Sequence, residues 1–238
     1  TCVLSSLALL AELTNDQSLK QRVRSFYDNG LWQMRDQIGW SIEDTRVEDN
    51  CGRGEANNSG DIVETALLLA SWGDTQYYGD VERILRSHLL PSQLRDVSFV
   101  VEPDNPGSVD GLSNVAARLQ GGFGFPAQYG HEPAGIWESN KPRIGFNLDI
   151  VGGAVDSLCF AYEAVARSDA SGHWINLLFD HQTEDLQVRS PYIHERLGVK
   201  LKQPGPLHVR LISGLNLEPA DDRSARARVE NGYAVIDN

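Results

Sequence analysis

The sequence lacks the features of several large protein classes. It has no run of about 20 apolar residues, the length that a membrane-spanning helix needs. It also has no lysine and arginine block, and its 21 basic and 33 acidic residues give a net charge of −12. This composition disfavours nucleic acid as a partner, because no basic block can displace counterions from phosphates. We therefore expect no nucleic-acid partner and no membrane partner.

Common cofactor and nucleophile motifs are absent as well. The sequence has no GxGxxG before a helical pattern, no GxSxG and no Walker sequence. The glycine-rich segment 121–124 lacks the lysine of a phosphate loop, and we interpret it as a close backbone turn. Cys2, Cys51 and Cys159 are far apart and form no C-x-x-C pair, which disfavours a disulfide framework and a thiolate metal site. We expect no cofactor and no metal.

What is present indicates a folded protein. A hydrophobic fraction of 41% and five tryptophans favour a packed core over disorder. The sequence shows no start methionine and no signal-peptide pattern, and it begins within an apolar helical pattern. We interpret it as an internal fragment, whose partner is the rest of its parent polypeptide. The sequence gives no localisation.

The period of the apolar residues changes along the chain. Apolar residues recur at helical spacing in five segments: 3–11, 19–34, 62–70, 78–89 and 151–165. Short polar turns join the first pair and the second pair, which predicts two antiparallel αα-hairpins. Ser59 is the predicted N-cap of the third segment, with Asp61 in its first turn.

After His173 the period becomes two. The predicted strands are 174–179, 186–189, 197–202 and 207–212, and Asn231-Gly232 is the predicted tip of a hairpin. We predict a multidomain α+β protein, in which a helical-hairpin domain spans 1–170 and an antiparallel β-sandwich begins in 171–238.

Two irregular polar segments are expected to line a cleft. They are the loops 43–61 and 120–149, which lie at helix ends, where a rigid scaffold commonly presents function. Carboxylates are the most plausible chemistry there, because glycosidic bond cleavage commonly needs a proton donor and a second group that is a nucleophile or a water activator. Glu55, at the entrance to a helix, is the best single candidate. Asp61 can equally serve the helix dipole, and Glu64 fits better as part of a solvated helix face.

The longer loop supplies further candidates. His131-Glu132 is a titratable pair, although a lone loop histidine is more often structural. Tyr129 and Trp137 offer faces on which a sugar could stack, and equally fit a core. Asp149 precedes the last helical segment, and it equally fits the role of an N-terminal helix residue.

Three segments, 54–94, 146–165 and 173–192, resemble the β-L-arabinofuranosidase-like glycoside hydrolases. The resemblance implies a six-hairpin (α/α)6 barrel followed by a β-sandwich, of which this chain would hold the C-terminal part of the barrel. In that family a Glu-x-Cys pair and a Cys-Cys pair bind zinc, and one of the cysteines is the nucleophile. Here the matching positions read Glu55-Ala56-Asn57 and Gly152-Gly153. The resemblance thus implies a divergent member without this motif. The family's acid/base glutamate lies upstream, in the region of Glu43 and Glu48, and the resemblance does not choose between these two residues.

Three functions remain open. The first is hydrolysis of a glycosidic bond in a plant-type or algal oligosaccharide by carboxylate residues. The second is non-catalytic carbohydrate binding or a scaffold role, and the third is a polysaccharide lyase using Tyr129, His131 and Arg143. For the hydrolase, the predicted catalytic residues are Glu55, His131 and Glu43, and the predicted substrate-binding residues are Asn57, Tyr129, Glu132, Trp137 and Asp149.

Overall fold

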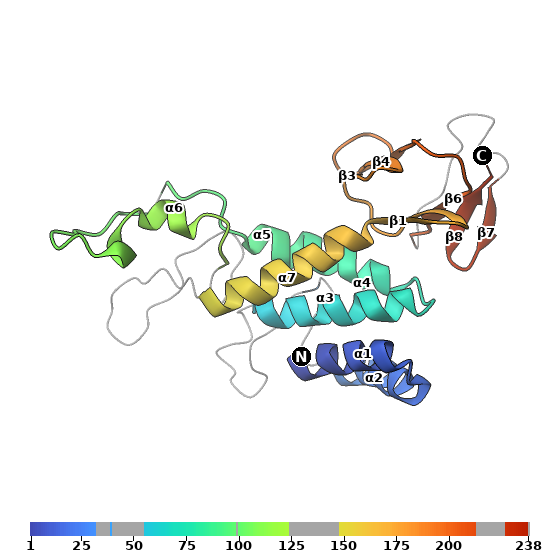
Figure 1. Ribbon diagram of the computed structural model, residues 1–238, viewed down its shortest axis with the longest axis horizontal. Helices are drawn as coiled ribbons and strands as arrows, with labels where there is room; N and C mark the ends of the chain where they lie inside the picture. Colours follow the sequence, from blue (N-terminus) through green and yellow to red (C-terminus); the bar gives the residue numbers. More distant parts are fainter. Residues whose placement is uncertain (32–38, 40–54, 99, 124–147, 213–226, 238) are drawn as a thin grey trace.

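The computed structural model describes residues 1–31, 39, 55–98, 100–123, 148–212 and 227–237, and all structural statements concern these. Helices occupy one part of the molecule and two sheets lie at one end of it (Figure 1). The helical elements are α1 (Cys2–Thr14), α2 (Gln17–Gly30), α3 (Ala56–Ser71), α4 (Tyr77–Ile84), the π-helical turn η3 (Leu85–Leu89), α5 (Leu90–Ser92), the 3-10 turn η4 (Asp110–Leu112), α6 (Val115–Leu119) and α7 (Leu148–Ala164).

Two helical hairpins form as predicted. Between α1 and α2, Asn15 adopts the left-handed conformation with φ 49° and ends the first helix. Asp16 then caps the second helix, since its Oδ1 accepts a hydrogen bond of 3.0 Å from the Leu19 amide. The hairpin of α3 and α4 closes through a tight turn at Trp72 and Gly73.

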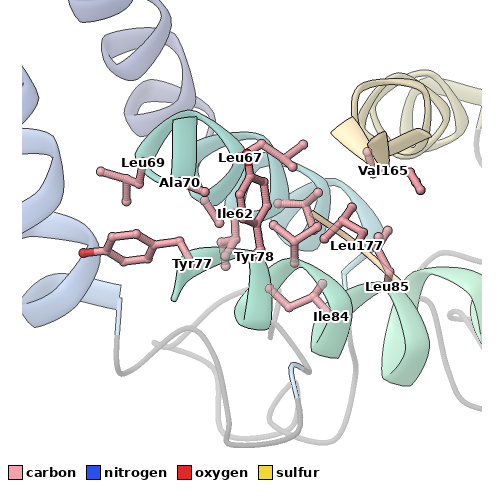
Figure 2. Packing of buried hydrophobic residues seen from close by; sticks show 14 of the residues in the cluster. Ile62, Leu67, Leu69, Ala70, Tyr77, Tyr78, Ile84, Leu85, Val165 and Leu177 are labelled. Atoms are coloured by element: carbon pink, nitrogen blue, oxygen red, sulfur yellow. The ribbon is translucent and has the colours of Figure 1, made fainter. Parts of the chain in front are cut away.

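The core of the helical part is built around α3. This helix packs against α1, α4 and α7, and Ile62, Val63 and Leu69 are almost completely buried. Figure 2 shows Ile62 and Leu69 of α3 in one cluster with Ile84 and with Leu177 from the β region. Burial of each such aliphatic side chain stabilises the fold by about 1.5–3 kcal/mol.

The start of α3 differs from the sequence prediction. The helix begins at Ala56, and Glu55 is its N-cap. A cap at Ser59 would have started the helix four residues later, at Gly60. Ser59 is instead fully buried inside the helix, where its hydroxyl bonds to Nδ1 of His88. A Glu side chain is rarely expected as a cap, and the partner of Ser59 is distant in sequence, so neither feature has a local signal.

The strands form two sheets. The larger has the order β1 (Ala166–Asp169), β2 (Gly172–Ile175), β6 (Leu207–Arg210), β8 (Tyr233–Ile236) and β7 (Arg228–Glu230). The smaller has the order β3 (His181–Gln182), β4 (Leu186–Arg189) and β5 (Gly198–Leu201). The predicted hairpin tip at Asn231-Gly232 is confirmed, with φ 48° and 80° at its two residues.

The predicted β architecture needs two corrections. β2 and β6 pair in parallel, so the larger sheet is mixed and not purely antiparallel. The chain leaves β2, builds the smaller sheet and returns in the same direction, and this long crossover makes the parallel pairing possible. In addition, β1 begins at Ala166, before the predicted boundary at residue 170. The described helices do not make up a six-hairpin barrel.

A buried ion pair joins the helices to the larger sheet. Glu82 of α4 pairs with Arg210 of β6, and the two side chains are 7% and 4% exposed. The second carboxylate oxygen of Glu82 accepts a hydrogen bond of 2.6 Å from the Leu178 amide. Arg210 also donates to the Asn176 carbonyl, and the Tyr233 hydroxyl donates to Oδ1 of Asn176 at 2.7 Å. The pair is therefore fully hydrogen-bonded, as a buried charge requires.

Substitution of Glu82 by Gln should destabilise the protein strongly. The change leaves the Arg210 charge buried without its counter-charge, which costs about 3–5 kcal/mol. The neighbouring Arg83, whose ion pair with Asp80 is at the surface, is the matched control. Arg83→Gln should cost less than about 1 kcal/mol in the same urea unfolding measurement. Equal losses in the two variants would contradict the role of the buried pair.

Candidate functional site

The N-terminal end of α3 is shaped by Glu55. Its Oε1 accepts a hydrogen bond of 3.1 Å from the Asn57 amide, and its Oε2 accepts one from the Asn58 amide. The residue is 5% exposed. Both oxygens thus satisfy amides that the first turn of a helix leaves without partners, and the negative charge complements the helix dipole.

Asn57 and Gly153 meet where α3 crosses α7. A β-carbon placed on Gly153 would lie 2.3 Å from Oδ1 of Asn57, so the amide occupies the space of a side chain at position 153. One turn further along α3, a β-carbon on Gly60 would lie 2.8 Å from Oγ of Ser157. Small residues therefore allow the close approach of the two helices. The structure brings together positions 55, 57 and 153, which the resemblance had singled out.

The Asn57 side chain has hydrogen-bonding capacity left over. Its Oδ1 is buried, and none of the described residues donates a hydrogen bond to it. A buried carbonyl oxygen without a donor is costly, and this one faces Gly153 at the contact between α3 and α7.

A polar stripe runs along α3 from this point. Asn57, Asp61 and Glu64 follow one another at helical spacing, and the Thr1 hydroxyl lies 2.6 Å from both Oδ1 of Asn58 and Oδ2 of Asp61. Burial, helped by the charges of Asp61 and Asp156, raises the pKa of Glu64 from 4.5 to about 7. Burial raises the pKa of Asp61 as well. Glu64 is thus protonated in part of the molecules at neutral pH, which its assignment to a solvated face did not foresee.

A second feature was missed by the sequence prediction. His88 is completely buried in the π-helical turn η3, and its Nδ1 lies 2.6 Å from Oγ of Ser59. Insertions of this kind often occur near functional sites. The contact ties η3 to the first turns of α3, so it supports the helix end that carries Glu55 and Asn57.

Several predicted site residues lie outside the described residues: Glu43, Tyr129, His131, Glu132, Trp137 and, for the lyase, Arg143. Asp149 is in the first turn of α7, and its side chain is not among those described.

Within the described part, no group of three or more His, Cys, Asp or Glu side chains is arranged to hold a metal ion. Cys159 is exposed on α7, about two helical turns past Gly152. None of the described helices has the length and apolar character needed to span a membrane.

Comparison with known proteins supports a distant likeness in fold. No family model matches the sequence, and no curated protein sequence matches it. The structure is similar to the crystal structure of a GH127 β-L-arabinofuranosidase from Geobacillus stearothermophilus T6, with a TM-score of 0.57 and 17% sequence identity. The match covers 98% of this chain and 38% of the arabinofuranosidase chain. At this identity the likeness concerns the fold alone.

Substitution of Gly153 by Ala should destabilise the contact between α3 and α7. The new β-carbon collides with Asn57, and overpacking of this kind costs about 1–3 kcal/mol. Gly152, whose β-carbon would have no atom within 4 Å, is the matched control. Gly152→Ala should stabilise α7 by about 0.5–1 kcal/mol. The free energy of unfolding in urea measures both effects, and addition of Asn57→Ala should recover most of the loss at position 153.

Glu64 should make stability depend on pH. Because its pKa is about 7 in the folded state and 4.5 in the unfolded state, its stabilising contribution is complete below pH 4.5 and is lost as the pH rises through 7. Glu64→Gln should therefore raise the free energy of unfolding at pH 8 by about 1–3 kcal/mol and change little at pH 4.5. Glu163→Gln, at an exposed position of α7, is the control. A gain in the Glu64 variant that is the same at both pH values would contradict this assignment.

Proposed function

We propose that this protein is carbohydrate-active and that it binds a sugar chain along the polar stripe of Asn57, Asp61 and Glu64. The likeness in fold to a β-L-arabinofuranosidase supports this class of ligand. The stripe offers two carboxyl groups and the side-chain amide of Asn57, and groups of both kinds hydrogen-bond to sugar hydroxyls.

We further propose that the protein hydrolyses a glycosidic bond of a plant-type or algal oligosaccharide with carboxyl groups. The observation that carries this step is the pKa of about 7 at Glu64. A carboxyl group that keeps its proton near neutral pH can protonate the leaving oxygen, and a second, ionised carboxylate can act as base or nucleophile. Asp61 and Asp156 are the neighbouring carboxylates that could take the second role.

Glu55 takes a positioning role in this proposal. Both of its oxygens accept amide hydrogen bonds from the first turn of α3, so it orients the helix that carries Asn57 and Glu64. Glu55→Gln retains one acceptor oxygen and should cost about 1 kcal/mol of stability, in the range of a lost N-cap bond.

Non-catalytic carbohydrate binding is the second candidate, and one observation favours it. Asn57 and Gly153 stand at the positions where the family that this chain resembles has cysteines, and the Asn57 side chain fills the space at position 153. Cysteine chemistry is therefore not available at this contact, while a sugar could still bind beside it.

A screen against plant and algal oligosaccharides separates these functions. If the protein is a hydrolase, Glu64→Gln should lower turnover by about 100-fold or more, the effect of losing a general acid, while it raises stability at pH 8. Loss of activity in a more stable protein cannot be due to unfolding. Glu163→Gln should keep full turnover.

Other results of the same screen have different meanings. Full turnover in Glu64→Gln would remove Glu64 from the mechanism. Sugar binding without any product would favour the non-catalytic function. Products that absorb ultraviolet light would indicate an unsaturated sugar and hence a lyase.

A further inference from the structure

A cavity of about 380 Å³ lies at the opposite end of α3 from the polar stripe. It is enclosed by the turn between α3 and α4 on one side and by the larger sheet on the other. Ser71 at the end of α3 lines it, and about 20 Å of helix separates this residue from Asn57. The cavity is therefore distinct from the candidate site described above.

Its floor is a stack of side chains across three strands. Arg167 of β1, Trp174 of β2 and His208 of β6 lie opposite one another in the register of the sheet. The Arg167 guanidinium carbon lies 4.3 Å from the centre of the Trp174 ring, and the His208 ring stacks on the indole at 4.5 Å with an angle of 13°. The stack holds these three side chains upright on one face of the sheet, so the polar edges of the rings remain for a ligand.

The two walls are held together by a close contact between turns. A β-carbon on Gly232, at the tip of the β7–β8 hairpin, would lie 2.1 Å from Oγ1 of Thr75 in the α3–α4 turn. Gly232 has φ 80°, a conformation that favours glycine. Both turns line the cavity, and the buried pair of Glu82 and Arg210 joins the neighbouring elements α4 and β6. The cavity is thus preformed.

Two polar groups that line the cavity form no hydrogen bond with a described residue. Tyr78 is 6% exposed and Trp174 is 8% exposed, and both line the cavity. Neither the Tyr78 hydroxyl nor the Trp174 indole N–H makes a hydrogen bond to a described residue. The adjacent tyrosines differ, because Tyr77 donates to Asp28 at 3.0 Å and Tyr233 donates to Asn176 at 2.7 Å. Neither atom is closed off from the cavity, so both are available to hydrogen-bond to a ligand that enters it.

The charge of the lining indicates what kind of ligand fits. One cation, Arg167, and one carboxylate, Glu230, face the cavity, so their formal charges cancel. Burial lowers the pKa of His208 below 6.5, which leaves a neutral imidazole with one donor and one acceptor at pH 7. Such a lining suits a ligand that is uncharged and carries both donors and acceptors. The volume lies at the lower end of small-molecule pockets, which limits the ligand to one or two rings.

We propose that this cavity binds a neutral sugar of one or two rings, as a second site separate from the polar stripe of α3. The Tyr78 hydroxyl, the Trp174 indole and the His208 imidazole would hydrogen-bond to its hydroxyl groups. The site would hold a sugar without cleaving it.

Titration calorimetry with L-arabinose, D-galactose, D-xylose and D-galacturonate tests the proposal. At least one of the neutral sugars should bind saturably at millimolar concentrations, and more tightly than D-galacturonate. Tyr78→Phe should weaken that binding by about 3- to 10-fold, because one hydrogen bond is lost while the ring remains. Arg167→Met is a second variant that should weaken binding, because it removes the guanidinium donors of the stack.

Two controls identify the site. Tyr77→Phe is the matched variant, because this hydroxyl bonds to Asp28 and does not line the cavity, so sugar affinity should be unchanged. Asn57→Ala, at the polar stripe, should also leave the affinity unchanged. Binding that Asn57→Ala abolishes and Tyr78→Phe leaves intact would overturn this inference while supporting the function proposed for the stripe. No binding of any neutral sugar, or tighter binding of D-galacturonate, would overturn it as well.

Discussion

The burial of α3 on several sides is the constraint on which the rest of the structure depends. Ten of its sixteen residues are buried, and it contacts the helices before and after it in the chain. A helix with apolar residues around most of its circumference must be covered by several neighbours. Polar groups are then left at its two ends and along one narrow stripe. These are the places where both proposed sites lie.

The close approach of α7 requires particular side chains along this helix. Gly60 of α3 faces Ser157 of α7, and Gly153 of α7 faces Asn57 of α3. In each of these two contacts a glycine on one helix makes room for a polar side chain of the other. The packing of α7 against α3 partly buries the stripe, and burial is the largest cause of the raised pKa of Glu64. The packing of the core and the chemistry of the stripe are thus two consequences of one helix contact.

Sequence reasoning succeeded where the signal is local. The Asn231-Gly232 turn was predicted from its residue pair, and the strand Leu186–Arg189 was predicted with the bounds that the structure has. The cap of α2 at Asp16 has an equally local cause. In each case a few neighbouring residues determine the conformation through their own φ preferences, side-chain oxygens or period.

Sequence reasoning failed where the cause lies far along the chain. The partner of Glu82 is 128 residues away, and nothing near Glu82 distinguishes it from an ordinary helix-surface glutamate. The parallel pairing of β2 with β6 depends on the path of an intervening sheet. The sequence prediction placed Glu64 on a solvated face and missed its raised pKa. The largest cause of that shift is burial, which only the packed structure produces, and Asp156 of another helix adds to it. At the candidate site, the resemblance identified positions 55, 57 and 153, but their contact required the structure.

The contact between Asn57 and Gly153 also constrains how this site can change. A cysteine at position 153 would place its β-carbon 2.3 Å from Oδ1 of Asn57, so it cannot be introduced while Asn57 keeps its present position. A cysteine at position 57 alone would remove the amide and leave a glycine opposite it, with a gap between α3 and α7. The two positions are therefore coupled, and a pair of thiols requires both substitutions together. Because this coupling is steric, it applies whether the protein cleaves its sugar or only binds it, and it directs the search for chemistry in this protein to the carboxyl groups of the stripe.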